Sequence, residues 1–467
     1  MIEIDKKFWK VEEVMLEKNK EYVVDIVDMG ESGVGIGKYD GFTVFVDCAL
    51  VGEKVKVKIN KSKKNYAVGD LVEIIEHSPY RVERVCDDSL KMCGGCQIQE
   101  LDYNKQLELK TNEVKQVISR IGKIEGATIH DTIGMETPFR YRNKAQFPVQ
   151  MRKGEPVIGF YKKKSHEVIP TDKCMIQHEL NDEIIEVVRE FIVENNISVY
   201  DEVKHKGLLR HIVTKIGFTT GEVMVVLVAN GKNVPNVNKL VKMLEERIKG
   251  FKTLVVNVNT NKTNVILGRE NKVICGTGKI NDYIGNLVFE ISPLSFFQVN
   301  PVQTEVLYNK ALEYANLTGN ETVFDIYCGI GTISLFLAQK AKKVYGIEIV
   351  EDAIKDAKRN AELNGLENTE FYAGKAEEVV PKMYKEGKKA DVVVVDPPRK
   401  GCDEKVLDTI VSMDPERVVY VSCNPSTLAR DLAYMDERGF KCVEIQPVDM
   451  FPHSVHVENV ALLVPKK

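Results

Sequence analysis

The chain has 467 residues, of which 43% are hydrophobic and 29% charged, and its formal net charge is −4. That length predicts two to four domains, and the composition is typical of a soluble globular protein. No apolar run reaches the length of a membrane span, and MIEIDKKFWK has no secretory pattern, so we expect a cytoplasmic protein. In that compartment the 10 cysteines favour metal binding or catalysis over disulfides.

Residues 18–76 consist of short segments in which apolar and polar residues alternate. The segments EYVVDIVDM, GFTVFVD, EKVKVKIN and GDLVEIIE are separated by glycine-containing turns. This spacing predicts a small β-barrel of short strands. Lysines crowd residues 54–64, which is usual for a solvated face; contact with the phosphates of a nucleic acid is the alternative.

A cluster of cysteines follows the predicted barrel. Cys86, Cys93 and Cys96 lie within CDDSLKMCGGCQIQ, and a further candidate, Cys174, lies within PTDKCMIQH. Glycines between cysteines let backbone amides approach the sulfurs, so the thiols can converge on one metal centre. Zinc and iron-sulfur clusters both accept four thiolates, so the spacing leaves both open, together with unligated cysteines in a core.

The middle of the chain predicts a mixed α/β region. Residues 100–121 have the periodicity of a helix, and residues 140–276 contain strand-like runs around a helix-like stretch at 237–248. Arg140 and Arg142 lie a few residues before an aromatic side chain, a combination that suits a splayed nucleotide. A charged loop beside a core phenylalanine explains the same pattern equally well.

Regular alternation of strands and helices begins near residue 276. The run VFDIYCGIGTISLFLAQ predicts a strand, a glycine loop and a helix, and the next strand ends at Glu348. Glycines at such a turn let the backbone approach a nucleoside, and a carboxylate at the next strand end can accept hydrogen bonds from both ribose hydroxyls. The pattern predicts a cofactor that contains adenosine, and it leaves NAD and S-adenosyl-L-methionine both open.

Cys423 is the candidate for covalent chemistry. In VVYVSCNPSTLARDL it stands between a valine-rich strand and the start of a helix. The unpaired amides of a helix N-terminus favour a thiolate, the nucleophilic form of the side chain, although a buried structural cysteine is the competing explanation. Two further motifs carry acids: DVVVVDPPRKG places Asp396 after a strand, and DMFPHSVHVE ends in Glu458.

Together, DPPRKG, SCNPST and DMFPHSVHVE resemble the signatures of the RNA (uracil-5-)-methyltransferase family. The resemblance covers nearly the whole chain and implies an α/β fold with a class I, Rossmann-like methyltransferase domain over residues 278–467. It also implies that the barrel, residues 15–77, is a TRAM module of the oligonucleotide-binding (OB) type. A central α+β domain, residues 78–277, would carry an iron-sulfur cluster, with the helix near 100–121 packed on the catalytic domain.

The implied reaction is methylation of carbon 5 of a uridine by S-adenosyl-L-methionine. Carbon 5 of uracil is a poor nucleophile, and attack of a cysteine thiolate on carbon 6 would activate it. Hydride transfer at a nicotinamide needs no such cysteine, which favours S-adenosyl-L-methionine over NAD. The resemblance assigns Cys423 as nucleophile and Glu458 as general base; Gln298, Tyr327, Glu348 and Asp396 as cofactor contacts; and Cys86, Cys93, Cys96 and Cys174 as ligands of a [4Fe-4S] cluster.

Family members that combine a TRAM barrel with the cysteine cluster generally act on large-subunit ribosomal RNA. We therefore expect 23S rRNA as the partner, a monomeric enzyme and no membrane association. The alternatives are a tRNA uridine-5-methyltransferase and a non-catalytic RNA-binding protein. A radical enzyme is a third alternative, because a cluster would accompany S-adenosyl-L-methionine, but a fourth cysteine ligand favours a closed structural cluster.

Overall fold

The computed structural model describes residues 15–30, 32–86 and 92–466, which fall into two compact units. The first unit comprises the chain up to Arg84 together with Gln97–Leu109, and the second comprises Val85–Cys96 and the chain from Lys110 onward. Each unit is described by itself. None of the described helices is long and apolar enough to cross a membrane.

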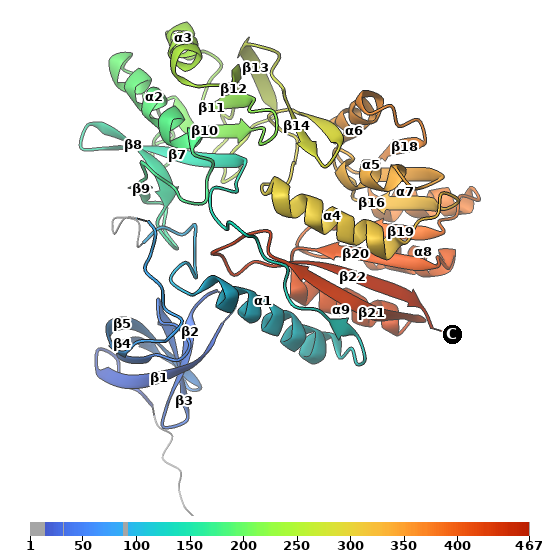
Figure 1. Cartoon of the computed structure of the whole chain (residues 1–467). Helices are drawn as coiled ribbons and strands as arrows, with labels where there is room; N and C mark the ends of the chain where they lie inside the picture. The colour runs from blue at the N-terminus through green and yellow to red at the C-terminus, as the bar shows by residue number, and fades with distance from the viewer. Residues whose placement is uncertain (1–14, 31, 87–91, 467) are drawn as a thin grey trace, which may run out of the picture. The chain divides into compact units, whose positions relative to one another are not determined.

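The first unit contains a closed five-stranded barrel with the strand order β1-β2-β3-β5-β4 (Figure 1). Alternate residues such as Val44, Val46 and Val57 point inward and are fully buried, as the alternating sequence predicts. A Cβ at Gly69 would lie 2.1 Å from the side chain of Val57, so the barrel interior requires glycine there. The predicted barrel is confirmed; its strands are β1 (Glu21–Met29), β2 (Gly35–Tyr39), β3 (Phe42–Asp47), β4 (Lys54–Ser62) and β5 (Tyr66–Glu76).

A long helix, α1 (Tyr103–Val117), follows and continues into a π-helical turn at Ile118–Gly122. The second half of the helix belongs to the second unit. There Val114 and Ile118 are buried in the same hydrophobic core as Leu428, which lies five residues after Cys423. The predicted helix is confirmed, and its apolar side packs against the segment that carries Cys423.

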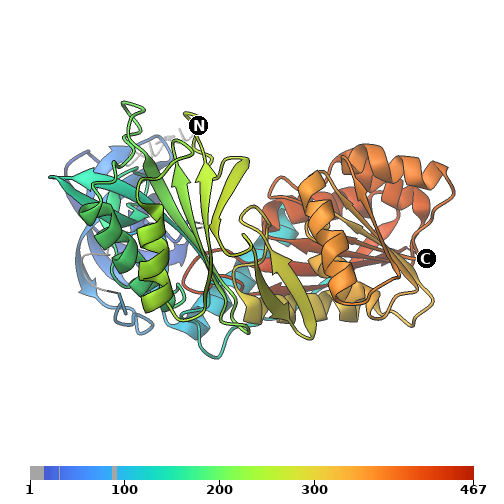
Figure 2. The same cartoon turned by 90° about the horizontal axis from the view of Figure 1, so that it is seen from above.

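A seven-stranded sheet forms the middle of the chain, with the order β13-β12-β11-β10-β7-β8-β9. Helices α2 (Leu180–Glu194) and α3 (Val237–Arg247) lie side by side on one face of it (Figure 2), and their apolar residues share one core with the sheet. The strands are β7 (Lys144–Arg152), β8 (Glu155–Tyr161), β9 (Val168–Pro170), β10 (Leu209–Ile216), β11 (Val223–Ala229), β12 (Phe251–Val258) and β13 (Glu270–Cys275).

The carboxyl-terminal part of the chain forms an eight-stranded sheet with the order β18-β17-β16-β19-β20-β22-β21-β6. Strands β16 to β20 run parallel, and the order reverses between β16 and β19, where ligands of open α/β sheets bind. The strands are β6 (Thr128–Ile129), β16 (Thr322–Ile326), β17 (Lys343–Glu348), β18 (Thr369–Ala373), β19 (Val392–Val395), β20 (Arg417–Ser422), β21 (Phe440–Val448) and β22 (Glu458–Pro465).

Six helices of this segment are described, and they flank the sheet or precede it. They are α4 (Pro301–Ala315), α5 (Thr332–Ala338), α6 (Glu351–Leu363), α7 (Ala376–Lys385), α8 (Glu404–Met413) and α9 (Pro425–Asp436). The architecture agrees with the predicted class I methyltransferase domain. The domain boundaries stay a prediction, and β6, which lies within the segment predicted as the central domain, pairs with β21 of this sheet.

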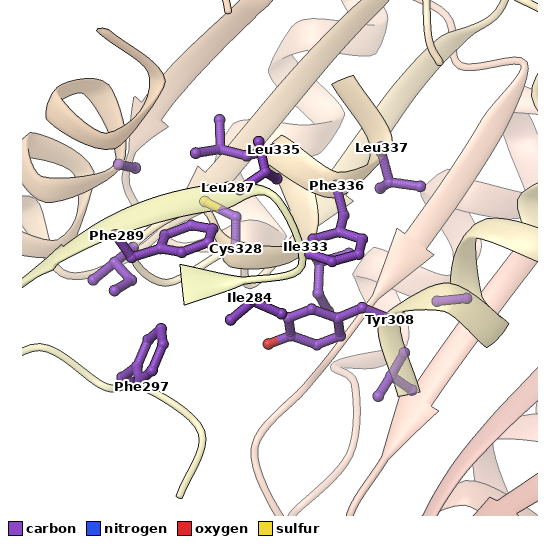
Figure 3. Close-up of a cluster of buried hydrophobic side chains, with 14 of the residues drawn as sticks. Ile284, Leu287, Phe289, Phe297, Tyr308, Cys328, Ile333, Leu335, Phe336 and Leu337 are labelled. Carbon is purple, nitrogen blue, oxygen red and sulfur yellow. The ribbon is translucent and has the colours of Figure 1, made fainter. Parts of the chain in front are cut away.

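A hairpin of β14 (Ile280–Ile284) and β15 (Leu287–Ile291) packs against α4 and α5. Figure 3 shows Phe289, Tyr308 and Phe336 turned toward one buried cluster, and the rings of Tyr308 and Phe336 meet edge to face at 5.5 Å. The hydroxyl of Tyr308 lies 2.9 Å from that of Thr332, the first residue of α5. This core therefore fixes the start of the helix that follows the glycine loop.

Candidate active site

Sheet register brings Cys423 and Glu458 together. β20 ends at Ser422 and β22 begins at Glu458, and Ser422 pairs with Asn459 in the antiparallel ladder. Cys423 and Glu458 are therefore the next residues at the same edge of the sheet. The predicted turn is confirmed, because Cys423 stands between the end of β20 and the start of α9.

The thiol of Cys423 is not a preformed thiolate in the ligand-free protein. Burial, together with the nearby carboxyl groups of Glu458 and Asp396, raises its pKa to about 11, and Arg399 opposes that rise. A backbone amide at the helix start does lower the pKa of the thiol, as expected, but burial and the two acids outweigh it in this state. The side chain of Asn424 accepts from the Ser426 amide at 3.0 Å, so this cap takes up the helix N-terminus while two acids face the sulfur.

The carboxyl groups of the two acids beside the thiol lose their protons near neutral pH. Burial raises the pKa of Glu458 to about 8, with Asp396 adding to the effect and Arg399 opposing it. Burial also raises the pKa of Asp396 to about 7, and the nearby Asp325 contributes. Groups that titrate near neutral pH can both give and take protons, which is the property that acid-base chemistry needs.

The loop that carries Asp396 and Arg399 is tied to the start of α9. Asn424 Nδ2 and Thr427 Oγ1 each donate to the backbone carbonyl of Arg399 at 3.2 Å. Gly401 has φ +80°, and a Cβ there would lie 2.5 Å from the Asp431 carboxylate, so only glycine fits. The DPPRKG and SCNPST motifs therefore form one fixed structure.

Glu348 stands where the sequence predicts a ribose-binding acid. At the end of β17 its Oε2 accepts from the Gly329 amide at 3.2 Å and its Oε1 accepts from the Val350 amide at 2.9 Å. Gly329 has φ +55°, and a Cβ there would meet no heavy atom within 4 Å, so the glycine loop borders open space. A carboxylate held by amides beside an open glycine loop fits the adenosine part of S-adenosyl-L-methionine.

Two of the other predicted cofactor residues lie at the same switch point. Tyr327 directly follows β16 and Asp396 directly follows β19, so with Glu348 they occupy three neighbouring strand ends. Tyr327 has φ +73°, a strained conformation for a bulky side chain, and its amide donates to the Ile347 carbonyl at 2.9 Å. Gln298 is buried just before α4.

The predicted cluster ligands lie in loops of the second unit, and residues 87–91 between them lie outside the described chain. Burial raises the pKa of Cys174 to about 11, and its neighbours Cys93 and Cys86 add to the rise. Backbone amides donate to sulfur at two of these cysteines: those of Ile176 and Gln177 at Cys174, and that of Gly95 at Cys93, at 3.4 Å. Thiols that accept from amides fit an iron-sulfur site.

The metal itself is not established by this arrangement. Within the described residues, no group of three or more histidines, cysteines or acids is arranged to hold a metal ion. Cys96 lies near Tyr141, where its charge would raise the pKa of the phenol further than burial already does. The [4Fe-4S] cluster and its four ligands therefore stay a prediction.

Comparison with known proteins identifies the family. The family model described as tRNA (Uracil-5-)-methyltransferase matches residues 102–466, and that of the TRAM domain matches residues 16–72. The chain belongs to the tRNA (uracil-5-)-methyltransferase family. Membership confirms the predicted class of enzyme, an RNA methyltransferase that acts on carbon 5 of uracil and uses S-adenosyl-L-methionine.

Relatives match this family member over nearly its full length. Proteins named uncharacterized RNA methyltransferases, from Caldanaerobacter subterraneus subsp. tengcongensis and from Clostridium tetani, are 54% and 51% identical to it. The alignments cover 95% and 97% of this chain and 98% of each relative. Among solved structures, the tRNA (uracil-54, C5)-methyltransferase of Pyrococcus abyssi, in complex with S-adenosyl-L-homocysteine, is similar with a TM-score of 0.77 and 31% identity, over 94% of this chain and 99% of that one.

Sequence reasoning missed two fully buried polar residues of the uracil-5-methyltransferase segment, Asp325 and Lys110. Asp325 of β16 is fully buried; its Oδ2 accepts from Ser334 at 2.5 Å, and its Oδ1 has no hydrogen-bond partner among the described residues. Lys110 of α1 is fully buried as well. The available signals were an acid inside the apolar strand VFDI and a lysine four residues before Val114, a spacing that puts both on the same face of the helix.

Proposed function

We propose that this protein methylates carbon 5 of a uridine in 23S rRNA through a covalent bond between Cys423 and carbon 6, with Glu458 as the general base. The observation that carries the proposal is the pairing of Ser422 with Asn459, which puts a thiol and a carboxyl group side by side. Both lie at the strand edge that also holds Glu348 and Asp396. A flipped pyrimidine between them would meet the nucleophile, the base and the methyl donor together.

The first step activates the uracil ring. Cys423 loses its proton to solvent, and its sulfur forms a bond to carbon 6, while the electron pair of the 5,6 double bond moves toward the carbonyl oxygen at carbon 4 as an enolate. Arg399, which already lowers the pKa values of Cys423 and Glu458, is the cation positioned to stabilise that negative charge. Binding of an RNA phosphate near Arg399 would oppose this effect.

The second step forms the new carbon bond. S-adenosyl-L-methionine supplies a methyl group on a positively charged sulfonium, and carbon 5 bonds to that methyl group as the carbon–sulfur bond breaks and leaves a neutral thioether. Glu348 would hold the ribose hydroxyls, and Gln298, Tyr327 and Asp396 would orient the rest of the donor. The amides of Gly329 and Val350 fix Glu348 beforehand, so little ordering is left for the moment of binding.

The last step releases the product. The carboxylate of Glu458 takes the proton from carbon 5, the electrons of that bond restore the 5,6 double bond, and the carbon–sulfur bond to Cys423 breaks to return the thiolate. Burial in the ligand-free protein raises the pKa of Glu458 to about 8, which makes its carboxylate a stronger base than an exposed glutamate. The acid and the thiol thus act in separate steps.

Cys86, Cys93, Cys96 and Cys174 would hold a [4Fe-4S] cluster in the same enzyme. Amide donors at Cys93 and Cys174 support a thiolate-bound group there. With four protein ligands the cluster would be closed, so it would cross-link the loops without taking part in methyl transfer. This assignment argues against the radical alternative.

Two RNA classes compete as substrate. The combination of a barrel with four cysteines supports 23S rRNA, by resemblance to the ribosomal branch of the family. The full-length likeness to the Pyrococcus abyssi tRNA enzyme supports tRNA as the second candidate. Both candidates use the same chemistry at Cys423, so the two questions can be tested separately.

The test uses transcripts of 23S rRNA and of tRNA, incubated with wild-type protein or Cys423→Ala and methyl-labelled S-adenosyl-L-methionine. We expect 5-methyluridine at a defined position of the 23S transcript with wild-type protein and none with the variant. Labelled methyl groups in tRNA alone would show that tRNA is the substrate in place of 23S rRNA. Methylated product from Cys423→Ala would show that Cys423 is not the nucleophile. RNA binding without methylation on either transcript would support the non-catalytic alternative.

A further inference from the structure

The segment between β21 and β22, residues 449–457, is held by side chains from three other parts of the chain. We call it the strap, because it runs directly into Glu458. Four consecutive carbonyls of the strap each accept a hydrogen bond from a distant side chain. The donors are Gln303 Nε2 to Asp449 at 3.1 Å, Asn300 Nδ2 to Met450 at 3.1 Å, Lys110 Nζ to Phe451 at 3.2 Å and Tyr141 Oη to Pro452 at 3.0 Å.

Lys110 makes the charged contact among these tethers. Its Nζ lies 2.5 Å from Asp449 Oδ1, and the side chains are 1% and 0% exposed. Burial lowers the pKa of Lys110, and Asp449 opposes that shift. Desolvation of two buried charges cancels much of their attraction, so hydrophobic residues of similar size would stabilise such a site about as well. The directional hydrogen bonds of Lys110 therefore suggest a role in geometry.

The rest of the strap is also ordered by specific contacts. The ring of His453 stacks on Phe139 with 4.4 Å between centroids, and Ser454 donates to the Phe451 carbonyl through its amide at 3.1 Å and its hydroxyl at 2.8 Å. Glu458 is thus approached from two sides. The ladder of β20 and β22 fixes the backbone that follows Glu458, and the strap fixes the backbone that precedes it.

We propose that Lys110 is a positioning residue for Glu458: by holding Asp449 and the Phe451 carbonyl at once, it sets the path of the strap and hence the aim of the carboxylate at carbon 5. This inference rests on the proposed function. Glu458 acts only after methyl transfer, so an error in its position should slow release of the product while leaving attack by Cys423 unchanged. A displacement of about 1 Å at a catalytic group costs roughly 100-fold in rate.

The experiment compares wild-type protein with Lys110→Met, which keeps the length of the side chain and removes its ammonium. Lys115→Met is the matched control, because Lys115 lies on the same helix but is 48% exposed and 3.9 Å from Asp131. Each protein is mixed with RNA and labelled S-adenosyl-L-methionine, and free methylated RNA and covalent protein–RNA adduct are measured over time. We expect Lys110→Met to form methylated adduct at the wild-type rate and to release product roughly 10- to 100-fold more slowly.

Tyr141→Phe tests the same idea without a buried charge, since it deletes one hydroxyl from the tether to Pro452. We expect a smaller accumulation of adduct in this variant and none with Lys115→Met. Release at the wild-type rate in Lys110→Met, or in Tyr141→Phe when Lys110→Met does not fold, would overturn the inference. Equal losses of adduct formation and release would overturn it too, whereas absence of methylation by the wild-type protein would overturn the proposed function instead.

Discussion

The edge of the catalytic sheet and the cysteine loops were both predicted from short motifs. The structure brings the predicted residues together at the sheet edge but does not assemble a metal site in the described part of the loops. At the sheet edge, Cys423 and Glu458 meet because Ser422 pairs with Asn459. In the loops, Cys174 has Cys86 and Cys93 near it, but the described residues form no metal-holding group. A backbone ladder places side chains without help, whereas a metal site in loops takes its final geometry from the group it binds.

The largest effect should come from removing the sulfur at the sheet edge. Cys423→Ala is expected to lower methylation by roughly 10⁴-fold or more, because no other described thiol lies at that strand end. Cys442→Ala is the matched control, since Cys442 is buried in β21 of the same sheet. Incorporation of labelled methyl groups into RNA measures both. Comparable methylation by the two variants would show that the thiol of Cys423 takes no part in the reaction.

Glu458→Gln tests the second member of the pair. The exchange keeps the size of the side chain and removes the base, so turnover is expected to fall roughly 10²- to 10⁴-fold. Because attack by Cys423 does not need Glu458, methylated RNA should remain bound to the protein through a denaturing gel. Full turnover by the variant would assign the proton removal to another group.

The pH dependence should follow from two groups that must lose protons. The pKa of Cys423 is raised to about 11 and that of Glu458 to about 8, so kcat/KM on RNA should rise with pH through the neutral range. Initial rates from pH 6 to 9, with Lys115→Met as a control, measure the slope. A rate that falls over that range would mean that the reaction requires a protonated group and would contradict the requirement for deprotonated Cys423 and Glu458.

Stability should move in the opposite direction. The pKa of Glu458 in the folded protein, about 8, exceeds its ordinary value of 4.5, so the unfolded chain releases that proton first and wild-type stability falls as pH rises between these values. Glu458→Gln has no such proton. Its advantage in the free energy of unfolding, measured by denaturant titration, should therefore be small at pH 5 and grow toward pH 8 to the order of a few kcal/mol. A constant difference would contradict the raised pKa.

The smallest effect on chemistry is expected at the cysteine loops. Cys174→Ser should lose bound iron and lower Tm by several degrees, yet form the covalent adduct within a few-fold of the wild-type rate at saturating RNA. Iron content, thermal melting and adduct formation measure the three quantities. A loss of adduct as large as that of Cys423→Ala would give the loops a direct part in the reaction.

The positions of Asp396 and Cys423 at the sheet edge could be predicted because the ends of buried strands can be recognised in the sequence. Valine runs before Asp396 and Cys423 predict buried parallel strands, and the carboxyl ends of such strands meet at one edge. The raised pKa of Cys423 could not be predicted, since it depends first on burial and then on Glu458 and Asp396, which come near the sulfur only in the folded sheet. Lys110 was missed for the same reason: its partner, Asp449, lies 339 residues away.

The most direct test of the shared edge uses RNA in which 5-fluorouridine replaces uridine. Fluorine at carbon 5 cannot leave as a cation, so the base-assisted step fails and the protein should stay bound to the methylated nucleotide. The account predicts a one-to-one covalent complex whose RNA-linked peptide contains Cys423. Attachment through a different residue, or turnover of the fluorinated RNA without any covalent complex, would contradict it.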